Sequence, residues 1–241
     1  MIPIKDVIPR RETPFVNYLL IAINVFVFLI EVSLPRHMLE WVFYVFGLVP
    51  ARYTHPAWAY IMGLHFDNYW PFFTNMFLHA SWFHLLVNMW ALWIFGDNVE
   101  DRMGHFRYLI FYLLCGIAAS ITHFVFNLNS TVPAVGASGA IAGVMGAYII
   151  LFPHSRIITL IPLFFIPYFI EIPAVIFLGF WFLSQLIAGT FSIFAGQQAG
   201  GVAWWAHIGG FVFGMATHAF FKKKQQDYRV YYPDEVYFRF L

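Results

Sequence analysis

Apolar residues fall into six long runs along the chain, separated by shorter polar stretches. The runs lie near 15–32, 76–96, 107–127, 138–152, 172–194 and 203–221. A transmembrane α-helix needs about 20 predominantly apolar residues to cross a hydrocarbon layer of about 30 Å. The pattern therefore predicts an all-α, polytopic membrane protein built as a bundle of six transmembrane helices.

The runs and their connections predict one membrane domain over 1–221, followed by a short tail, 222–241. A further apolar segment, 157–169, contains Pro162 and Pro167. Proline breaks helices, and the pieces on either side are too short to span a bilayer. We expect this segment to lie at the membrane interface.

The basic residues predict the orientation of the bundle. If the N-terminus is cytoplasmic, the inside segments hold all but two of the 13 Lys and Arg residues, and only Arg36 and Arg52 lie outside. Cytoplasmic segments of membrane proteins carry such an excess of positive charge. An even number of spans keeps both basic ends on one face, so we expect the N- and C-termini to be cytoplasmic.

The composition agrees with a bilayer as the main partner. Apolar residues and Tyr make up 61% of the chain and charged residues 10%, against about 25% charged residues in soluble domains. The formal net charge of +1 supplies no basic field, so nucleic acid is not an expected partner. Cys115 is the only cysteine, which excludes an intrachain disulfide.

Polar side chains are few inside the apolar runs, and the candidates for a functional role are His79, His84, Asn88, Ser138 and His207. A polar group inside a membrane is expensive and is a functional hypothesis by default. In the predicted orientation the last four lie in the outer half of the bilayer. His84 and Asn88 are four residues apart, so they share one face of their helix. The four residues predict a site that opens to the outer side.

Small residues surround the serine and follow the histidine. The flanking glycines are Gly136, Gly139, Gly210 and Gly214. Small residues at helical spacing let two helix backbones approach closely, as a short serine side chain needs in order to reach a histidine on another helix. From Ser138 to Pro153 the helix is only about 22 Å long, which places the serine below the outer surface.

These positions suit acyl-transfer chemistry. A neutral His207 can take the hydroxyl proton of Ser138 and return it to a leaving amine. The free N–H groups at a helix start, together with His84 and Asn88 as side-chain donors, can stabilise an oxyanion. No carboxylate lies in the outer half to orient His207, so the sequence predicts a Ser-His dyad that needs no metal or cofactor.

Structural roles remain open for each residue taken alone, since a lone serine between glycines or a lone membrane histidine more often packs or bonds between helices. Other intramembrane chemistries fit less well. No His-Glu-x-x-His pattern is present for zinc, and no aspartate lies at a helix centre. A channel or transporter remains possible, although no matched pair of broken helices is visible.

Three motifs resemble those of the rhomboid family of intramembrane serine proteases, in its minimal six-helix prokaryotic form. They are His79-Ala-Ser-Trp-Phe-His84-Leu-Leu-Val-Asn88, Gly136-Ala-Ser138-Gly139 and Ala206-His207-Ile-Gly-Gly210-Phe-Val-Phe-Gly214. The segment Gly96-Asp-Asn-Val-Glu100-Asp-Arg102-Met-Gly104 also matches, and its Glu and Arg look structural. The resemblance to this family covers nearly the whole chain.

The resemblance implies Ser138 as nucleophile, His207 as general base, and His84, Asn88 and the Ser138 backbone N–H as oxyanion donors. It implies a prokaryotic cell membrane and transmembrane proteins as substrates. Ala142 stands where some relatives carry a tyrosine that stacks on the histidine. Because the family includes catalytically silent members that bind membrane clients, such a binding role is the second interpretation.

Overall fold

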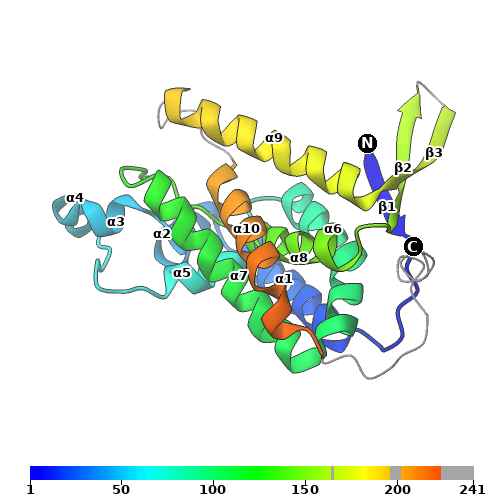
Figure 1. The fold of residues 1–241 in the computed structure, drawn as a ribbon. Helices are drawn as coiled ribbons and strands as arrows, with labels where there is room; N and C mark the ends of the chain where they lie inside the picture. Colours follow the sequence, from blue (N-terminus) through cyan, green and yellow to red (C-terminus); the bar gives the residue numbers. More distant parts are fainter. Residues whose placement is uncertain (164–165, 196–201, 224–241) are drawn as a thin grey trace.

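The computed structural model describes residues 1–163, 166–195 and 202–223 (Figure 1). Helices form near all six predicted runs: α1 (Phe15–Ser33), α6 (Trp82–Met103), α7 (His105–Phe126), α8 (Ser138–Leu151), α9 (Ala174–Ala195) and α10 (Trp204–Phe221). Between α1 and α6 lie the short helices α2 (Arg36–Phe46), α3 (Ala51–Thr54), α4 (Pro56–Ile61) and α5 (Pro71–Thr74) and the 3-10 helix η1 (Asn75–Phe77). The strands are β1 (Ile2–Asp6), β2 (Arg156–Leu163) and β3 (Ile166–Pro173).

Helix α8 is the centre of the bundle. It packs against α6, α7 and α10, and every residue from Gly139 to Tyr148 is buried. Its small residues make this central place possible, because a Cβ added to Gly143 would overlap the side chain of Cys115 on α7. The apolar, glycine-rich sequence of this run thus produces a helix that other helices, and not lipid, surround.

By length and composition, three described helices can cross a membrane: α1, α7 and α9. A fourth is counted if the bent pair Pro71–Phe77 and Trp82–Met103 forms one span. Helix α8 has 14 residues, or about 21 Å of helix. The chain is thus mostly helical with three to four candidate spans, and the count of six stays a prediction.

The second predicted run is divided by a sharp bend. The run 76–96 was expected as one helix, but η1 ends at Phe77 and α6 starts at Trp82, with an angle of 92° between the two parts. Ser81 explains the new start, since its side chain accepts a hydrogen bond from the His84 backbone N–H at 3.2 Å and so caps α6.

The chain is not all-α, because the described residues include a three-stranded antiparallel sheet in the order β1-β2-β3. The described residues of the segment 157–169, expected at the membrane interface, belong to β2 and β3. Its prolines exclude a helix but tolerate these strand positions. Pro162 faces Pro167 near the hairpin end, beyond Leu160, the last β2 residue that pairs with β1.

One carboxyl group ties the sheet to the bundle. Asp6 Oδ2 accepts hydrogen bonds from Asn98 Nδ2 on α6 and from the Tyr148 hydroxyl on α8, each at 2.6 Å. At the other side of the sheet, β3 ends at Pro173 and α9 begins at Ala174, so the hairpin continues directly into α9 (Figure 1).

The ends of α1, α6 and α10 that lie far from Ser138 meet at one end of the molecule. Lys223 Nζ forms an ion pair with Glu12 at 3.1 Å, and its backbone N–H donates to the Arg102 carbonyl at 2.9 Å. This arrangement brings the segment before α1 and the α6–α7 turn next to the end of α10. The predicted tail lies outside the described residues beyond Lys223.

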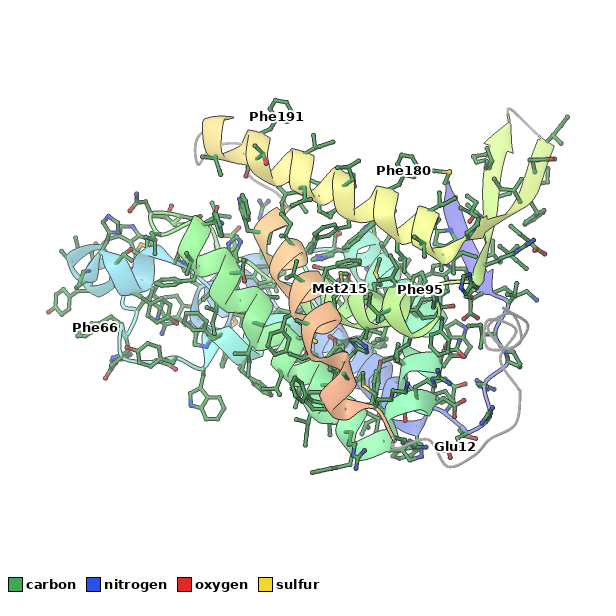
Figure 2. The ribbon with its side chains drawn as sticks, viewed as in Figure 1. Glu12, Phe66, Phe95, Phe180, Phe191 and Met215 are labelled. Atoms are coloured by element: carbon green, nitrogen blue, oxygen red, sulfur yellow. The ribbon has the colours of Figure 1, made fainter. Side chains whose placement is uncertain are left out.

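Helix α9 runs along the outside of the bundle (Figure 1). It is the least buried of the three long apolar helices. Phe180 and Phe191 are 65% and 69% exposed, and Figure 2 shows both side chains directed away from the other helices. The opposite face carries the buried Leu178 and Gln185 and turns toward α10.

Candidate active site

The predicted nucleophile and base come from helices whose backbones touch. Helix α8 begins at Ser138, and His207 lies in the first turn of α10. Ser138 Oγ is 2.7 Å from His207 Nε2. A Cβ added to Gly210 would overlap the Gly139 carbonyl oxygen, and one added to Gly214 would overlap the Gly143 carbonyl oxygen. The glycines therefore allow the close approach that a short serine side chain requires.

The segment before Ser138 is held from two sides. Ala134 exchanges two backbone hydrogen bonds with Leu48, at 2.8 and 3.0 Å, and the Gly136 N–H donates to the Asn75 carbonyl at 2.9 Å. Gly136 has φ of 132°, a backbone conformation that side-chain-bearing residues rarely adopt. Glycine at this position lets the chain turn sharply into α8 and present Ser138 at the helix start.

The His84 ring lies over this turn. A Cβ added to Gly136 would be 2.7 Å from His84 Nε2 and 3.6 Å from Ser138 Oγ, so both groups border the same point. The His79 ring packs edge-on against the His84 ring, with centroids 5.2 Å apart. The backbone N–H of His79 donates to the Glu31 carboxylate of α1 at 3.2 and 3.3 Å, which fixes the loop that carries the His79 ring just before α6.

Asn88 lies one turn further into α6 and is 5% exposed. Its Nδ2 is buried and has no hydrogen-bond partner among the residues that the structure describes. A buried donor without a partner is costly in a fold and calls for an explanation. The first N–H groups of α8 lack intrahelical acceptors in the same way. Both sets of donors are of the kind that binds a developing negative charge.

A residue that the sequence analysis missed completes the surroundings of His207. Gln185 of α9 places its Oε1 2.8 Å from His207 Nδ1, and both side chains are buried. Two tryptophan rings flank the imidazole, Trp181 at 5.8 Å and Trp204 at 6.2 Å between ring centroids. A carboxylate is the usual orienting group for a catalytic histidine, and a single amide in an apolar helix carries no sequence pattern that marks it for this role.

A cavity of about 590 Å³ opens beside these groups. His84, Trp204 and residues 125–130, at the end of α7 and just after it, line this cavity. A much smaller pocket contains Ser138 and shares His123, Ala134, Val135 and Ala203 with the larger cavity. Ser138 thus lines a small pocket next to the larger cavity, which is bordered by the ends of α7 and α9 and the start of α10.

Glu100 and Arg102 lie at the other end of α6, away from the serine. The Glu100 carboxylate accepts the backbone N–H groups of Val16 at 2.9 Å and Asn17 at 2.7 Å, and it contacts His105 Nδ1 at 2.5 Å. It therefore supplies the cap that the first turn of α1 lacks, since Pro14 offers no side-chain acceptor. The Arg102 guanidinium lies over the Phe152 ring at 5.2 Å.

Comparison with known proteins identifies the family of this chain. The model of the rhomboid domain matches residues 67–224, which carry every residue of the candidate site. The chain belongs to the rhomboid family. As a rhomboid protein with several apolar helices, it is a multi-pass membrane protein.

Similar rhomboid proteins occur in bacteria and in mitochondria. The chain is 42% identical over 89 residues to the rhomboid protease GluP of Bacillus subtilis, and the matched stretch covers 37% of this chain and 17% of that protein. It is 32% identical over 117 residues to the putative rhomboid protease YdcA of the same organism, covering 47% and 58%. Rhomboid protein 1, mitochondrial, of Saccharomyces cerevisiae is 34% identical over 91 residues, covering 36% and 26%. The matched stretches span less than two thirds of each of these relatives.

Proposed function

We propose that this chain is an intramembrane serine endopeptidase that hydrolyses peptide bonds in or next to transmembrane segments of other membrane proteins. The observation that carries the proposal is the 2.7 Å approach of Ser138 Oγ to His207 Nε2 in a buried site. The homology of the chain to rhomboid proteases, including GluP, supports the same reaction.

In the proposed reaction, Ser138 Oγ attacks the scissile carbonyl while His207 Nε2 takes the hydroxyl proton. The tetrahedral oxyanion accepts hydrogen bonds from the Ser138 backbone N–H and from the His84 and Asn88 side chains. His207 then donates its proton to the leaving amine, and an acyl-enzyme forms on Ser138. Water, deprotonated by His207, releases the second fragment and restores the serine.

The proposed orientation follows from the two ends of the bundle. Ser138, His84 and His207 lie near one end, whereas Arg102 and Lys223 lie at the other. With the basic end in the cytoplasm, the site opens to the outer side of a prokaryotic cell membrane. The substrates would then be transmembrane proteins that present a peptide bond in the outer half of the bilayer.

The test is cleavage of a panel of reporter transmembrane segments by the purified protein in liposomes. Ser138→Ala and His207→Ala should each lower kcat by at least about 10³-fold while the protein stays folded. Ser33→Ala is a matched control, because among the described residues the Ser33 hydroxyl bonds only to the Ile30 carbonyl of its own helix, at 2.7 Å. A folded wild type that binds these segments but cuts none would favour the client-binding role instead.

A further inference from the structure

The second ring nitrogen of His207 has a defined partner. His207 Nδ1 lies 2.8 Å from Gln185 Oε1, and the exposed fractions of the two residues are 9% and 5%. Gln185 belongs to α9, whereas Ser138 belongs to α8 and His207 to α10. Three helices thus meet at the imidazole, with the serine on one ring nitrogen and the amide on the other.

The hydrogen bonds around Gln185 fix which end of the amide faces His207. The Ser184 hydroxyl donates its proton to the Trp181 carbonyl at 2.6 Å, so the Ser184 oxygen can only accept from Gln185. The Gln185 atom 2.8 Å from that oxygen must therefore be the NH₂ nitrogen. The same nitrogen is 3.2 Å from the Trp181 carbonyl, which is also an acceptor only. The amide oxygen is left for His207.

This direction determines the tautomer of the imidazole. The amide oxygen accepts, so Nδ1 must carry the hydrogen, and a neutral ring then has its lone pair on Nε2. That lone pair faces Ser138 Oγ at 2.7 Å, which is the arrangement in which His207 can take the serine proton. The tautomer is thus specified by α9, a helix that carries none of the four residues predicted from the sequence.

We propose that Gln185 is a positioning residue that holds His207 in the Nδ1–H tautomer and orients its ring toward Ser138. This inference rests on the proposed protease function. The amide takes the orienting place that a carboxylate holds in a Ser-His-Asp triad, and its oxygen stabilises the imidazolium that forms when His207 accepts the proton. A neutral amide suits an apolar helix better than an ionised carboxylate, whose burial is far more costly.

Two tryptophan rings, Trp181 and Trp204, also help to hold the His207 imidazole in place. Trp181, one turn before Gln185, lies against the imidazole with an interplanar angle of 35°, and Trp204 meets it edge-on at 89°. These contacts supply the packing that a tyrosine in place of Ala142 gives some relatives. Because Trp181 and Gln185 both belong to the peripheral α9, the alignment of the base depends on where α9 lies.

Two substitutions at Gln185 separate orientation from packing. Gln185→Leu keeps a similar volume and removes the acceptor, so kcat for reporter cleavage should fall about 10- to 100-fold with little change in KM. Gln185→Glu keeps an acceptor oxygen toward Nδ1 and should stay within about tenfold of wild type. The matched control is Thr190→Val, because the one bond of the Thr190 hydroxyl within the described part of the chain is to the Leu186 carbonyl of α9, at 2.8 Å.

A spectroscopic measurement reports on the tautomer without any substrate. Nitrogen-15 NMR of histidine-labelled protein at about pH 9 distinguishes a protonated from an unprotonated ring nitrogen, with His207→Asn used to assign the signal. The wild type and Gln185→Glu should show Nδ1–H, and Gln185→Leu should show a mixture of tautomers. The same tautomer in Gln185→Leu as in wild type, or an unchanged kcat, would overturn the role of Gln185. If the wild type cuts no reporter, the protease proposal fails, while the nitrogen-15 spectra still decide whether Gln185 orients His207.

Discussion

Asn88 gives the sharpest prediction, because its loss should lower kcat without lowering the stability of the fold. Its Nδ2 is buried without a partner among the described residues, although the side chain is only 5% exposed. Such a donor destabilises the resting fold, and in the proposed mechanism it is satisfied only when an oxyanion forms. The perturbation is Asn88→Leu, which keeps a similar volume and removes the donor.

The expected magnitudes follow from the state of this one donor. A buried unsatisfied polar group costs about 1–3 kcal/mol, so removing it should leave the free energy of unfolding unchanged or raise it by up to about that amount. Loss of one oxyanion donor lowers kcat by about 10²- to 10³-fold, or about 2.7–4 kcal/mol of transition-state stabilisation. A residue that served only for packing would produce neither effect.

Asn17→Leu is the matched control. Asn17 is also a fully buried asparagine in an apolar helix, but both ends of its amide are paired: Nδ2 donates to the Leu92 carbonyl at 3.0 Å, and Oδ1 accepts from the Tyr108 hydroxyl at 2.8 Å. Its replacement leaves the Leu92 and Tyr108 groups without these partners, which should destabilise the fold by about 2 kcal/mol or more. The kcat of the folded fraction should stay at the wild-type value.

The assay combines initial rates of reporter cleavage in liposomes with reversible unfolding in mixed detergent micelles. If Asn88→Leu destabilised the protein as Asn17→Leu does and left kcat unchanged, Asn88 would be an ordinary interhelical contact. A fall in kcat that only mirrored a loss of folded protein would contradict the reasoning equally.

Three further predictions concern the supporting structure. Glu100→Gln should lower the free energy of unfolding by about 3 kcal/mol, because it removes a buried carboxylate that accepts two N–H groups of α1. Asp101→Asn is the control: Asp101 is partly exposed and accepts the Arg11 and Glu12 N–H groups, so this change should lower the free energy of unfolding by less than about 1 kcal/mol. Gly210→Ala should lower the free energy of unfolding by about 1–3 kcal/mol, and it should also lower kcat, because the added Cβ separates α10 from α8. A Cβ added to Gly179 has no atom within 4 Å, so Gly179→Ala should leave the stability unchanged or raise it, as measured by thermal unfolding. Burial, and to a smaller extent the Asp97 charge, raises the pKa of Asp6 from its ordinary value of 3.8 to about 7. The docking of β1 is therefore strongest below about pH 4, weakens as pH rises from about 4 to about 7, and changes no further above that. Hydrogen exchange of residues 2–6, corrected for its intrinsic pH dependence, should accelerate between about pH 4 and 7 in wild type and level off above pH 7, and Asp6→Asn should show no such change.

The helices and the meeting of Ser138 with His207 were accessible to sequence reasoning because both follow from local patterns. Apolar runs have the length of helices, and the glycines near Ser138 and His207 permit a close crossing. The bend after η1 depended on Ser81, whose capping bond to His84 is local but is hidden inside an apolar run.

The sheet and Gln185 were not accessible in the same way. β1 pairs with residues about 150 positions later, and neither strand alone carries a signal for the other. Gln185 is one amide in an apolar helix, and its relation to His207 exists only once α9 has packed beside α10. In both cases the contact joins separate elements of the chain, so it can be identified only once the positions of those elements in the fold are known.

The pairing of β1 with β2 has a consequence for biosynthesis. Ile2 faces Leu160 and Asp6 faces Ile157, so the strand emerges from the ribosome about 150 residues before its partner. At about 5–20 residues per second, β1 waits about 8 to 30 s, while α1, α6, α7 and α8 are synthesised. Asn98 and Tyr148, which donate to Asp6, are made 92 and 142 residues after it. β1 can therefore pair with β2 only after the helices up to α8 have been made.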